Sequence, residues 1–109
     1  MSYEVQLERG YAVVYLEGEI DMYQSPEARG AILNCLGNGH HTLVEMSAIR
    51  YIDSSGVASL VEGLQTARER DLRFALVGVS EAAMRVLQLA RLDGVFTIHP
   101  SVDRAPEVK

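Results

Sequence analysis

The order of apolar and polar residues along the chain predicts strands that alternate with helices. Residues 3–7 alternate apolar and polar side chains, as a half-buried strand does, and residues 11–16 are almost continuously apolar, as in a more buried strand. The turn residues Arg9 and Gly10 separate these two segments, so we expect an antiparallel hairpin. The chain then runs through residues 18–21 into a loop.

Three later segments carry apolar residues at helical spacing. The first begins at Ser25, a capping residue followed by proline, and ends at the glycines of residues 37–39. The second begins at residues 54–55, and Ser80 caps the third. Short apolar runs predict the remaining strands at residues 43–46, 73–79 and 95–98.

This order, β-β-α-β-α-β-α-β, predicts a single α/β domain with a mixed, mainly parallel β-sheet. The N-terminal β-hairpin supplies the antiparallel pairing, and the helices pack on the sheet. A chain of 109 residues is long enough for one domain and too short for two. We expect the domain to occupy residues 1–100 and residues 101–109 to form a polar, frayed C-terminal tail.

Charge and composition narrow the classes of partner. The net charge of −5 makes the bulk electrostatic interaction with nucleic acid repulsive, and we find no basic stripe, so we expect no direct nucleic-acid binding. No apolar run approaches the roughly 20 residues that span a bilayer, so we expect no membrane insertion. With no signal peptide visible at the N-terminus and a single cysteine, we expect a cytoplasmic protein.

The segment Asp53-Ser54-Ser55-Gly56 stands where a strand leads into a helix, a position whose free backbone N–H groups favour an anion. At about 100° per residue, Ser54 lies roughly 60° from Val57, at the edge of the apolar stripe, whereas Ser55 lies roughly 160° away. We therefore expect Ser54 to cap the helix, Ser55 to present an exposed hydroxyl, and Gly56 to leave its approach open. From spacing alone, such residues most often serve only as caps.

Other candidate groups predict structure rather than chemistry. Cys35 lies on the apolar face of the first helix, so we expect a buried structural thiol. His40 and His41 are adjacent, and His99 is distant in sequence, so we expect no metal site. The chain has no Gly-x-Ser-x-Gly elbow and no glycine-rich phosphate loop, so we expect neither an enzyme nor a cofactor.

Two motifs resemble those of the STAS family, which includes the bacterial anti-sigma factor antagonists. The segment 53–57, preceded by Tyr51-Ile52 and by Met46-Ser47, is similar to the family signature. The segment 18–21 resembles a second recurring motif, and the order of elements matches up to about Pro100, which implies a STAS-like domain. The chain departs from the family at Glu45, where aspartate is usual, and this leaves the role of that carboxylate open.

The resemblance implies a switch that is controlled by phosphorylation of Ser55. In the family, an anti-sigma factor that is also a serine kinase modifies the matching serine, and a PP2C-type phosphatase resets it. The unphosphorylated protein captures the anti-sigma factor and frees the sigma factor. The expected partner-binding residues flank Ser55 in the two motifs: Asp21, Met22, Tyr23, Asp53, Ser54 and Gly56. Met22 and Tyr23 are equally compatible with covering the edge of the core.

Two alternatives remain open at this point. The first is a constitutive STAS subunit of a larger assembly, such as a lipid-transport complex or a sensory scaffold, in which Ser55 is only a helix cap. The second is a carrier of a nucleotide or another small ligand, because weak nucleotide binding has been associated with the family.

Overall fold

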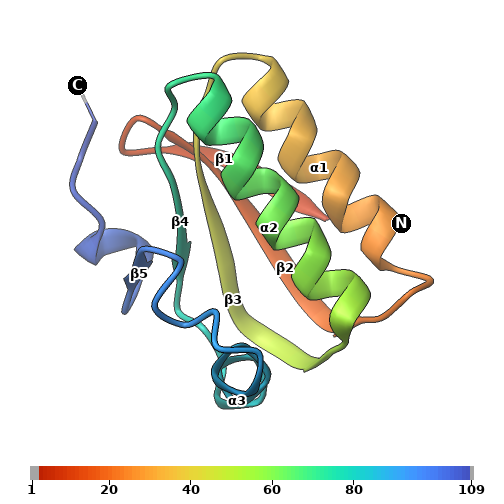
Figure 1. Ribbon diagram of the computed structural model, residues 1–109. Coiled ribbons are helices and arrows are strands. Elements are labelled where there is room, and N and C mark those ends of the chain that lie inside the picture. Colours follow the sequence, from red (N-terminus) through yellow and green to blue (C-terminus); the bar gives the residue numbers. More distant parts are fainter. Residues whose placement is uncertain (1–2, 109) are drawn as a thin grey trace.

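Two long parallel strands, β2 (Tyr11–Ile20) and β3 (His41–Ile52), form the centre of a five-stranded sheet in the computed structural model, which describes residues 3–108 (Figure 1). β1 (Glu4–Glu8) pairs antiparallel with β2, whereas β4 (Phe74–Val77) and β5 (Ile98–His99) continue the sheet in parallel beyond β3. The strand order is β1-β2-β3-β4-β5. The predicted mixed sheet with an N-terminal hairpin is therefore confirmed.

Three helices connect the parallel strands, in the predicted order. α1 (Ser25–Gly37) and α2 (Ser54–Glu69) lie side by side over the sheet, and α3 (Glu81–Leu89) lies at one end of them (Figure 1). All three helices contribute buried residues to one main core cluster with the strands. The Ser80 hydroxyl accepts a hydrogen bond from the Ala83 N–H at 3.2 Å, which confirms Ser80 as the cap of α3.

The two central strands extend well beyond the apolar runs that predicted them. Residues 18–20, which lie beyond the strand that we predicted at residues 11–16, belong to β2, because β2 and β3 pair up to Ile20 and Ile52. The register between the strands shifts twice, between Tyr15 and Glu17 and between Gly18 and Glu19. These irregularities interrupt the side-chain alternation by which a strand is recognised in a sequence, while the backbone pairing continues.

The outer strands are shorter than predicted. β4 covers Phe74–Val77 rather than residues 73–79, and β5 is the pair Ile98–His99 rather than residues 95–98. In the last case the prediction followed the apolar residues, but only Ile98 and His99 pair with β4. The apolar residue Phe96 instead packs into the main core cluster.

The residues after Pro100, which we expected to fray, pack against the sheet face opposite the helices. Ala105 is 1% exposed, and its carbonyl oxygen accepts a hydrogen bond from Arg9 Nη2 at 2.8 Å. The Val108 N–H donates to the Arg9 carbonyl oxygen at 3.0 Å, whereas Lys109 lies outside the described residues. The prediction followed the polar composition of this segment. Its few apolar residues are nevertheless enough for it to pack into a second, smaller core cluster, whose buried residues are Tyr11, Val13, Leu43, Ala75, Val77 and Ala105.

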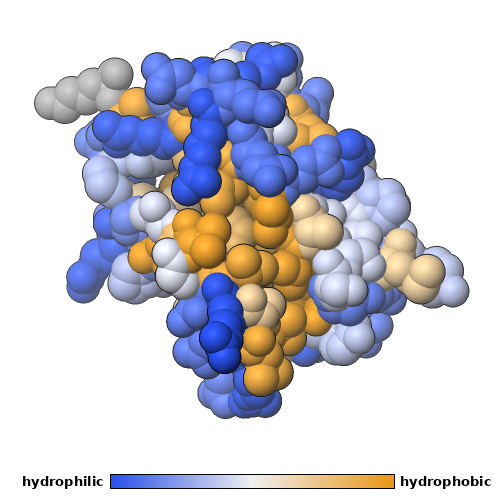
Figure 2. Space-filling view, viewed as in Figure 1, coloured by the Kyte–Doolittle hydropathy of each residue, from blue (hydrophilic) through white to orange (hydrophobic). Residues whose placement is uncertain are grey.

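Apolar residues also reach the surface on the helical side of the molecule. Figure 2 shows an apolar band in the middle of this face, between α2 and α3. The main core cluster includes partly buried residues from both helices and from the segments that follow β4 and α3, namely Val61, Val79, Val86 and Leu92. The core is therefore closed more completely between α1 and α2 than between α2 and α3.

A glycine in the middle of α2 sets how closely this helix approaches its neighbours. A Cβ atom at residue 63 would lie 2.8 Å from Ile32 Cγ2 of α1 and 2.9 Å from the Phe74 ring of β4. Such distances are too short for a carbon atom, so only glycine permits this packing of α1, α2 and the sheet. By contrast, a Cβ at Gly30 of α1 would meet nothing within 4 Å.

We predict opposite effects for alanine at these two helical glycines. Gly63→Ala overpacks the core against Ile32 and Phe74 and lowers the free energy of unfolding by about 1–3 kcal/mol. Gly30→Ala raises it by about 0.5–1 kcal/mol, because alanine is the better helix former and the space is open. Urea denaturation of both variants measures this difference, and equal effects would contradict the proposed packing of α2.

Candidate functional site

The Asp53 side chain connects the end of β3 to the beginning of α2. Asp53 is the N-cap residue of α2, and its Oδ1 accepts hydrogen bonds from the Ser55 N–H at 2.9 Å and from the Gly56 N–H at 3.2 Å. The Asp53 N–H in turn donates to the Ile20 carbonyl oxygen at the end of β2. One residue thus satisfies two free amides of the helix and joins it to both central strands.

The balance around this carboxylate favours its charged form. Desolvation raises the pKa of Asp53, but hydrogen bonds from Gly56, from the side chain and backbone of Ser55, and from the Met22 backbone outweigh it, so that the pKa lies below its ordinary value of 3.8. The Met22 interaction places the loop between β2 and α1 beside the start of α2. Asp53 is therefore a negative charge at the point where these three segments meet.

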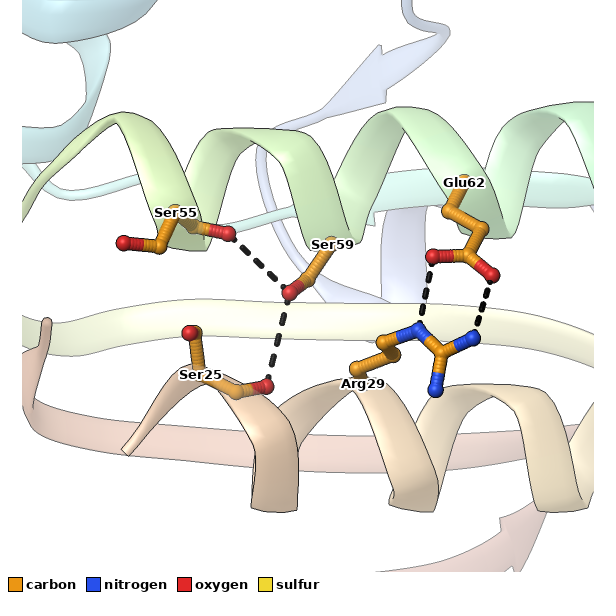
Figure 3. Close-up of polar contacts among 5 residues, drawn as sticks. All are labelled: Ser25, Arg29, Ser55, Ser59 and Glu62. Carbon is orange, nitrogen blue, oxygen red and sulfur yellow. Dashed lines mark hydrogen bonds and ion pairs between the residues drawn. The ribbon is translucent and has the colours of Figure 1, made fainter. Parts of the chain in front are cut away.

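Neither serine of the motif has the role that we predicted for it. Asp53, not Ser54, caps α2, and Ser54 is the exposed residue, whereas Ser55 is half-buried. The angular argument assumed a single buried stripe centred on Val57, but α2 is covered by the sheet on one side and by α1 on another. The side of α2 that carries Ser55 faces α1, which accounts for the partial burial of this residue (Figure 3).

Gly56 has a packing role that differs from the one we expected. It is buried, and a Cβ at this residue would lie 2.6 Å from Ile52 Cγ1 and 2.8 Å from the Ile20 carbonyl oxygen. The missing side chain therefore lets α2 begin against the ends of β2 and β3, rather than opening an approach to Ser55.

Ser59 fixes the position of the first turn of α2, and sequence reasoning missed it. Its Oγ lies 3.1 Å from the Ser55 carbonyl oxygen and 3.4 Å from the Ser25 carbonyl oxygen of α1 (Figure 3). Ser59 is 6% exposed, so its hydroxyl hydrogen is confined between these two acceptors. The signal in the sequence was a serine within the apolar face of the helix, between Val57 and Leu60.

An ion pair closes the same helix interface at the surface. Arg29 of α1 donates from Nε and Nη2 to the two carboxylate oxygens of Glu62 of α2, both at 2.7 Å (Figure 3). Both side chains are exposed, so solvent screens the pair and it contributes little to stability. The pair links α1 and α2 on the same side as the Ser59 contact with Ser25.

The loop between β2 and α1 places two exposed apolar side chains beside this site. The Asp21 carboxylate accepts hydrogen bonds from the Tyr23 and Gln24 N–H groups, both at 3.0 Å, in the turn that leads into α1. Ser25, which we expected to cap α1, is its first residue, and no side chain caps this helix. Met22 is 64% exposed and Tyr23 is 81% exposed. These two side chains therefore do not cover the edge of the core, which was one of the two interpretations left open by the sequence.

Asp21 also borders a groove whose charged lining residues are acidic except for Arg50. The groove has a volume of about 580 Å³, and Glu17, Glu19, Asp21 and Arg50 are among the residues that line it. Desolvation raises the pKa of Tyr3 at this groove, and the charges of Glu27, Asp21 and Glu17 raise it further. The surface next to the loop is therefore negative.

Glu45, the position that departs from the family pattern, serves the local backbone. Its Oε1 accepts hydrogen bonds from the N–H and the hydroxyl of Ser47, both at 3.0 Å. Gly78, which has a positive φ of 60°, leaves room for this carboxylate, because a Cβ there would lie 2.6 Å from Glu45 Oε2. The carboxylate is thus engaged at the register shift between β2 and β3.

The other candidate groups are placed as follows. Cys35 is buried as predicted, and desolvation raises the pKa of its thiol. His41 Nδ1 accepts a hydrogen bond from the Arg73 N–H at 2.9 Å. Within residues 3–108, no cluster of three metal-ligating side chains occurs, and none of the helices has the length and apolarity that crossing a membrane requires.

The fold and the site together define a class: a small α/β domain in which a half-buried serine, an N-cap aspartate and an apolar loop meet at one helix N-terminus. The family model of the STAS domain matches residues 2–105. The chain therefore belongs to the STAS domain family, as its motifs indicated.

Named relatives of this chain are bacterial anti-sigma factor antagonists. The anti-sigma-B factor antagonist of Listeria monocytogenes is 24% identical over 86 residues, which cover 78% of this chain and 75% of that protein. An anti-sigma factor antagonist from Mycobacterium paratuberculosis superposes with a TM-score of 0.81 and 26% identity, over 94% of this chain and 87% of that one. The phosphorylated form of the Bacillus cell fate determinant SpoIIAA superposes with a TM-score of 0.73 and 20% identity, over 95% and 96% of the two chains.

Substitutions of Asp53 separate its capping role from its charge. We predict that Asp53→Ala lowers the free energy of unfolding by about 1 kcal/mol at neutral pH, because two amides lose their acceptor. Asp53→Asn retains an acceptor and loses only the charge. Because the folded-state pKa is lowered, the stability due to the charge is present above the ordinary value of 3.8 and is lost as the pH falls through the folded-state pKa.

The difference in the free energy of unfolding between the wild type and Asp53→Asn should therefore become smaller in acid. The difference between Asp53→Asn and Asp53→Ala should remain. Urea denaturation at neutral pH and below about pH 4 measures both differences. A gap between wild type and Asp53→Asn that is independent of pH would show that the charge is not what the folded state stabilises.

Proposed function

We propose that this protein is an anti-sigma factor antagonist whose unphosphorylated form binds an anti-sigma factor that is also a serine kinase. Phosphorylation of Ser55 by that kinase switches binding off, and a PP2C-type phosphatase restores it. The observation that carries the proposal is the junction of a half-buried Ser55, the N-cap Asp53 and the exposed pair Met22 and Tyr23. We further propose that this cycle of binding, phosphorylation and dephosphorylation takes place in the cytoplasm.

The docking surface that we propose consists of the loop and the first turn of α2: Asp21, Met22, Tyr23, Asp53, Ser54, Ser55 and Gly56. Exposed methionine and tyrosine side chains are typical anchors of protein interfaces, because they supply large contact areas at a modest cost in conformational entropy. The Asp53 interaction with the Met22 backbone holds the loop against the helix, so that the anchors and Ser55 belong to one surface.

The electrostatics of the site explain why a phosphate would disturb this surface. The free amides of a helix N-terminus ordinarily stabilise a bound anion, but here the Ser55 and Gly56 amides already donate hydrogen bonds to the Asp53 carboxylate. A phosphate of charge about −1.5 to −2 on Ser55 would therefore stand beside a carboxylate without these amides to receive it. Juxtaposed like charges at an interface cost several kcal/mol, and about 4 kcal/mol corresponds to a thousandfold loss of affinity.

The relatives support this assignment in two ways. The Listeria monocytogenes relative is named an antagonist of an anti-sigma factor, and the match covers most of both chains. SpoIIAA, which shares the fold, exists in a phosphorylated form. A phosphate is therefore compatible with this architecture, and we propose that Ser55 carries it in this chain, with Ser54 as the neighbouring alternative.

The adjacent serines provide a matched test of the phosphorylation site. We predict that incubation with ATP and the anti-sigma factor kinase of the same bacterium adds one phosphate to the wild type and to Ser54→Ala, but none to Ser55→Ala. Mass spectrometry of the intact protein and of its peptides measures the modification. Phosphate on the more exposed Ser54, or equal modification of both serine variants, would contradict the assignment.

Binding to the same anti-sigma factor tests the switch. We predict that Ser55→Ala binds it as tightly as the wild type, that the phosphorylated protein binds about a thousandfold more weakly, and that Ser55→Asp loses about tenfold or more. Calorimetry measures these affinities, and circular dichroism verifies that all forms are folded. If Ser55→Asp and phosphorylated protein bind like the wild type, the chain is instead a constitutive subunit of a larger assembly.

Removal of the apolar anchors should affect binding and spare the fold. We predict that Met22→Ser combined with Tyr23→Ser weakens binding of the anti-sigma factor at least about tenfold. The free energy of unfolding should change by less than about 0.5 kcal/mol, because both side chains are exposed. Leu89→Ser is the matched control, since Leu89 of α3 is also 81% exposed, and binding that responds equally to both changes would contradict the proposed surface.

A further inference from the structure

β1 is an edge strand that leaves apolar side chains uncovered. Within residues 3–108, β1 pairs with β2 on one side only, so its other side presents unpaired backbone N–H and C=O groups. Val5 is 44% exposed and Leu7 is 72% exposed. An open edge with two exposed apolar residues is the surface to which an extended segment adds in strand addition.

The two faces of β1 differ in chemistry. Val5 and Leu7 lie opposite Val14 and Ala12 of β2, which belong to the core cluster beneath the helices, so they point to the helical side of the sheet. Glu4, Gln6 and Glu8 alternate with them and therefore point to the opposite side. The edge thus carries apolar residues on one face and mainly acidic residues on the other.

A groove continues the apolar face toward α1. It has a volume of about 540 Å³ and is lined by residues of β1 and α1 together with the residue before β1, including Tyr3, Val5, Gly30, Ala31, Asn34 and Cys35. Gly30 has open space where a side chain would stand. Side chains of a sixth strand beside Val5 would find walls that are apolar at Val5, Ala31 and Cys35 and polar at Glu27 and Asn34.

The opposite face of β1 is negatively charged. The Gln6 amide donates to the Glu4 carboxylate, and the Tyr15 hydroxyl of β2 donates to the Glu8 carboxylate, so both carboxylates are held on this face. Desolvation raises the pKa of Tyr15, and the hydrogen bond and charge of Glu8, followed by the charges of Glu45 and Glu4, raise it further. A strand beside β1 would therefore gain from cations at alternate positions.

We propose that the free edge of β1 binds an extended segment of a partner protein in which basic residues alternate with apolar ones. The backbone of this segment pairs with β1, its apolar side chains enter the groove beside Val5, and its basic side chains meet Glu4 and Glu8. This surface lies at the outer side of α1 and uses no residue of the proposed switch, so the inference does not depend on the proposed function.

A second copy of the chain is a poorer occupant of the same edge. Antiparallel pairing of the full strand with itself, centred on Gln6, places Glu4 opposite Glu8 in both halves of the pair. Like charges in directly opposite positions destabilise a sheet, and the net charge of −5 adds repulsion between copies. Charge complementarity therefore favours a basic segment from another protein.

The test uses a capped synthetic peptide of about seven residues that alternates lysine with valine, long enough to pair with all five residues of β1. We expect saturable changes in the NMR signals of the β1 amides, and none with a peptide that alternates glutamate with valine. Gly30→Leu, which fills the groove, should weaken binding at least about tenfold. Gly37→Leu is its matched control, since this glycine of α1 also has open space but does not line the groove.

A charge exchange makes the result specific. The double variant Glu4→Lys and Glu8→Lys should no longer bind the lysine peptide and should instead bind the glutamate peptide. The NMR signals of the core residues verify that this variant is folded. The proposal is overturned if the lysine peptide does not bind, or if binding is unchanged in Gly30→Leu and in the charge-exchanged variant. Concentration-dependent dimerisation through β1, measured by sedimentation without peptide, would also overturn it in favour of self-pairing.

Discussion

The beginning of α2 is held in contact with the ends of β2 and β3, and the rest of the candidate site depends on this contact. It exists because Gly56 has no side chain: a Cβ there would lie 2.6 Å from Ile52 Cγ1 and 2.8 Å from the Ile20 carbonyl oxygen. With the helix at this position, the Asp53 carboxylate can cap it while the Asp53 N–H bonds to Ile20. Ser55 is then enclosed between α2 and α1, with its carbonyl oxygen bonded to Ser59.

This arrangement changes the electrostatic role of the helix N-terminus. A helix start with free amides would stabilise an added phosphate, but here one aspartate already uses two of these amides and keeps its negative charge. An anion added to Ser55 would therefore lie close to the Asp53 carboxylate within the same turn. In the switch that we propose, its charge would repel the partner protein that binds this surface. The fold is held mainly by cores on both faces of the sheet, so such a local charge can alter binding without unfolding the domain.

Sequence reasoning recovered the fold, but not the orientation of the residues in the candidate site. The hairpin, the order of elements, the burial of Cys35 and the Ser80 cap follow from local patterns, and each was predicted. The exposed position was assigned to Ser55 instead of Ser54, because a helix covered on two sides has a wider buried surface than one apolar stripe reveals, and the cap is Asp53 rather than Ser54. The C-terminal segment was expected to fray because its composition is polar. Its anchoring by Arg9 was missed because that contact joins residues nearly a chain length apart.

The sequence by itself determined which residues can form strands and helices, where glycine and proline interrupt them, and which motif carries the serines. These properties depend on neighbours within a few residues, through propensity, capping and periodicity. Only the tertiary structure decided how far β2 and β3 extend, which serine is half-buried, and which edge of the sheet remains open with an acidic face. These features depend on contacts between distant segments, such as Ser59 with Ser25, and no local pattern in the sequence encodes them.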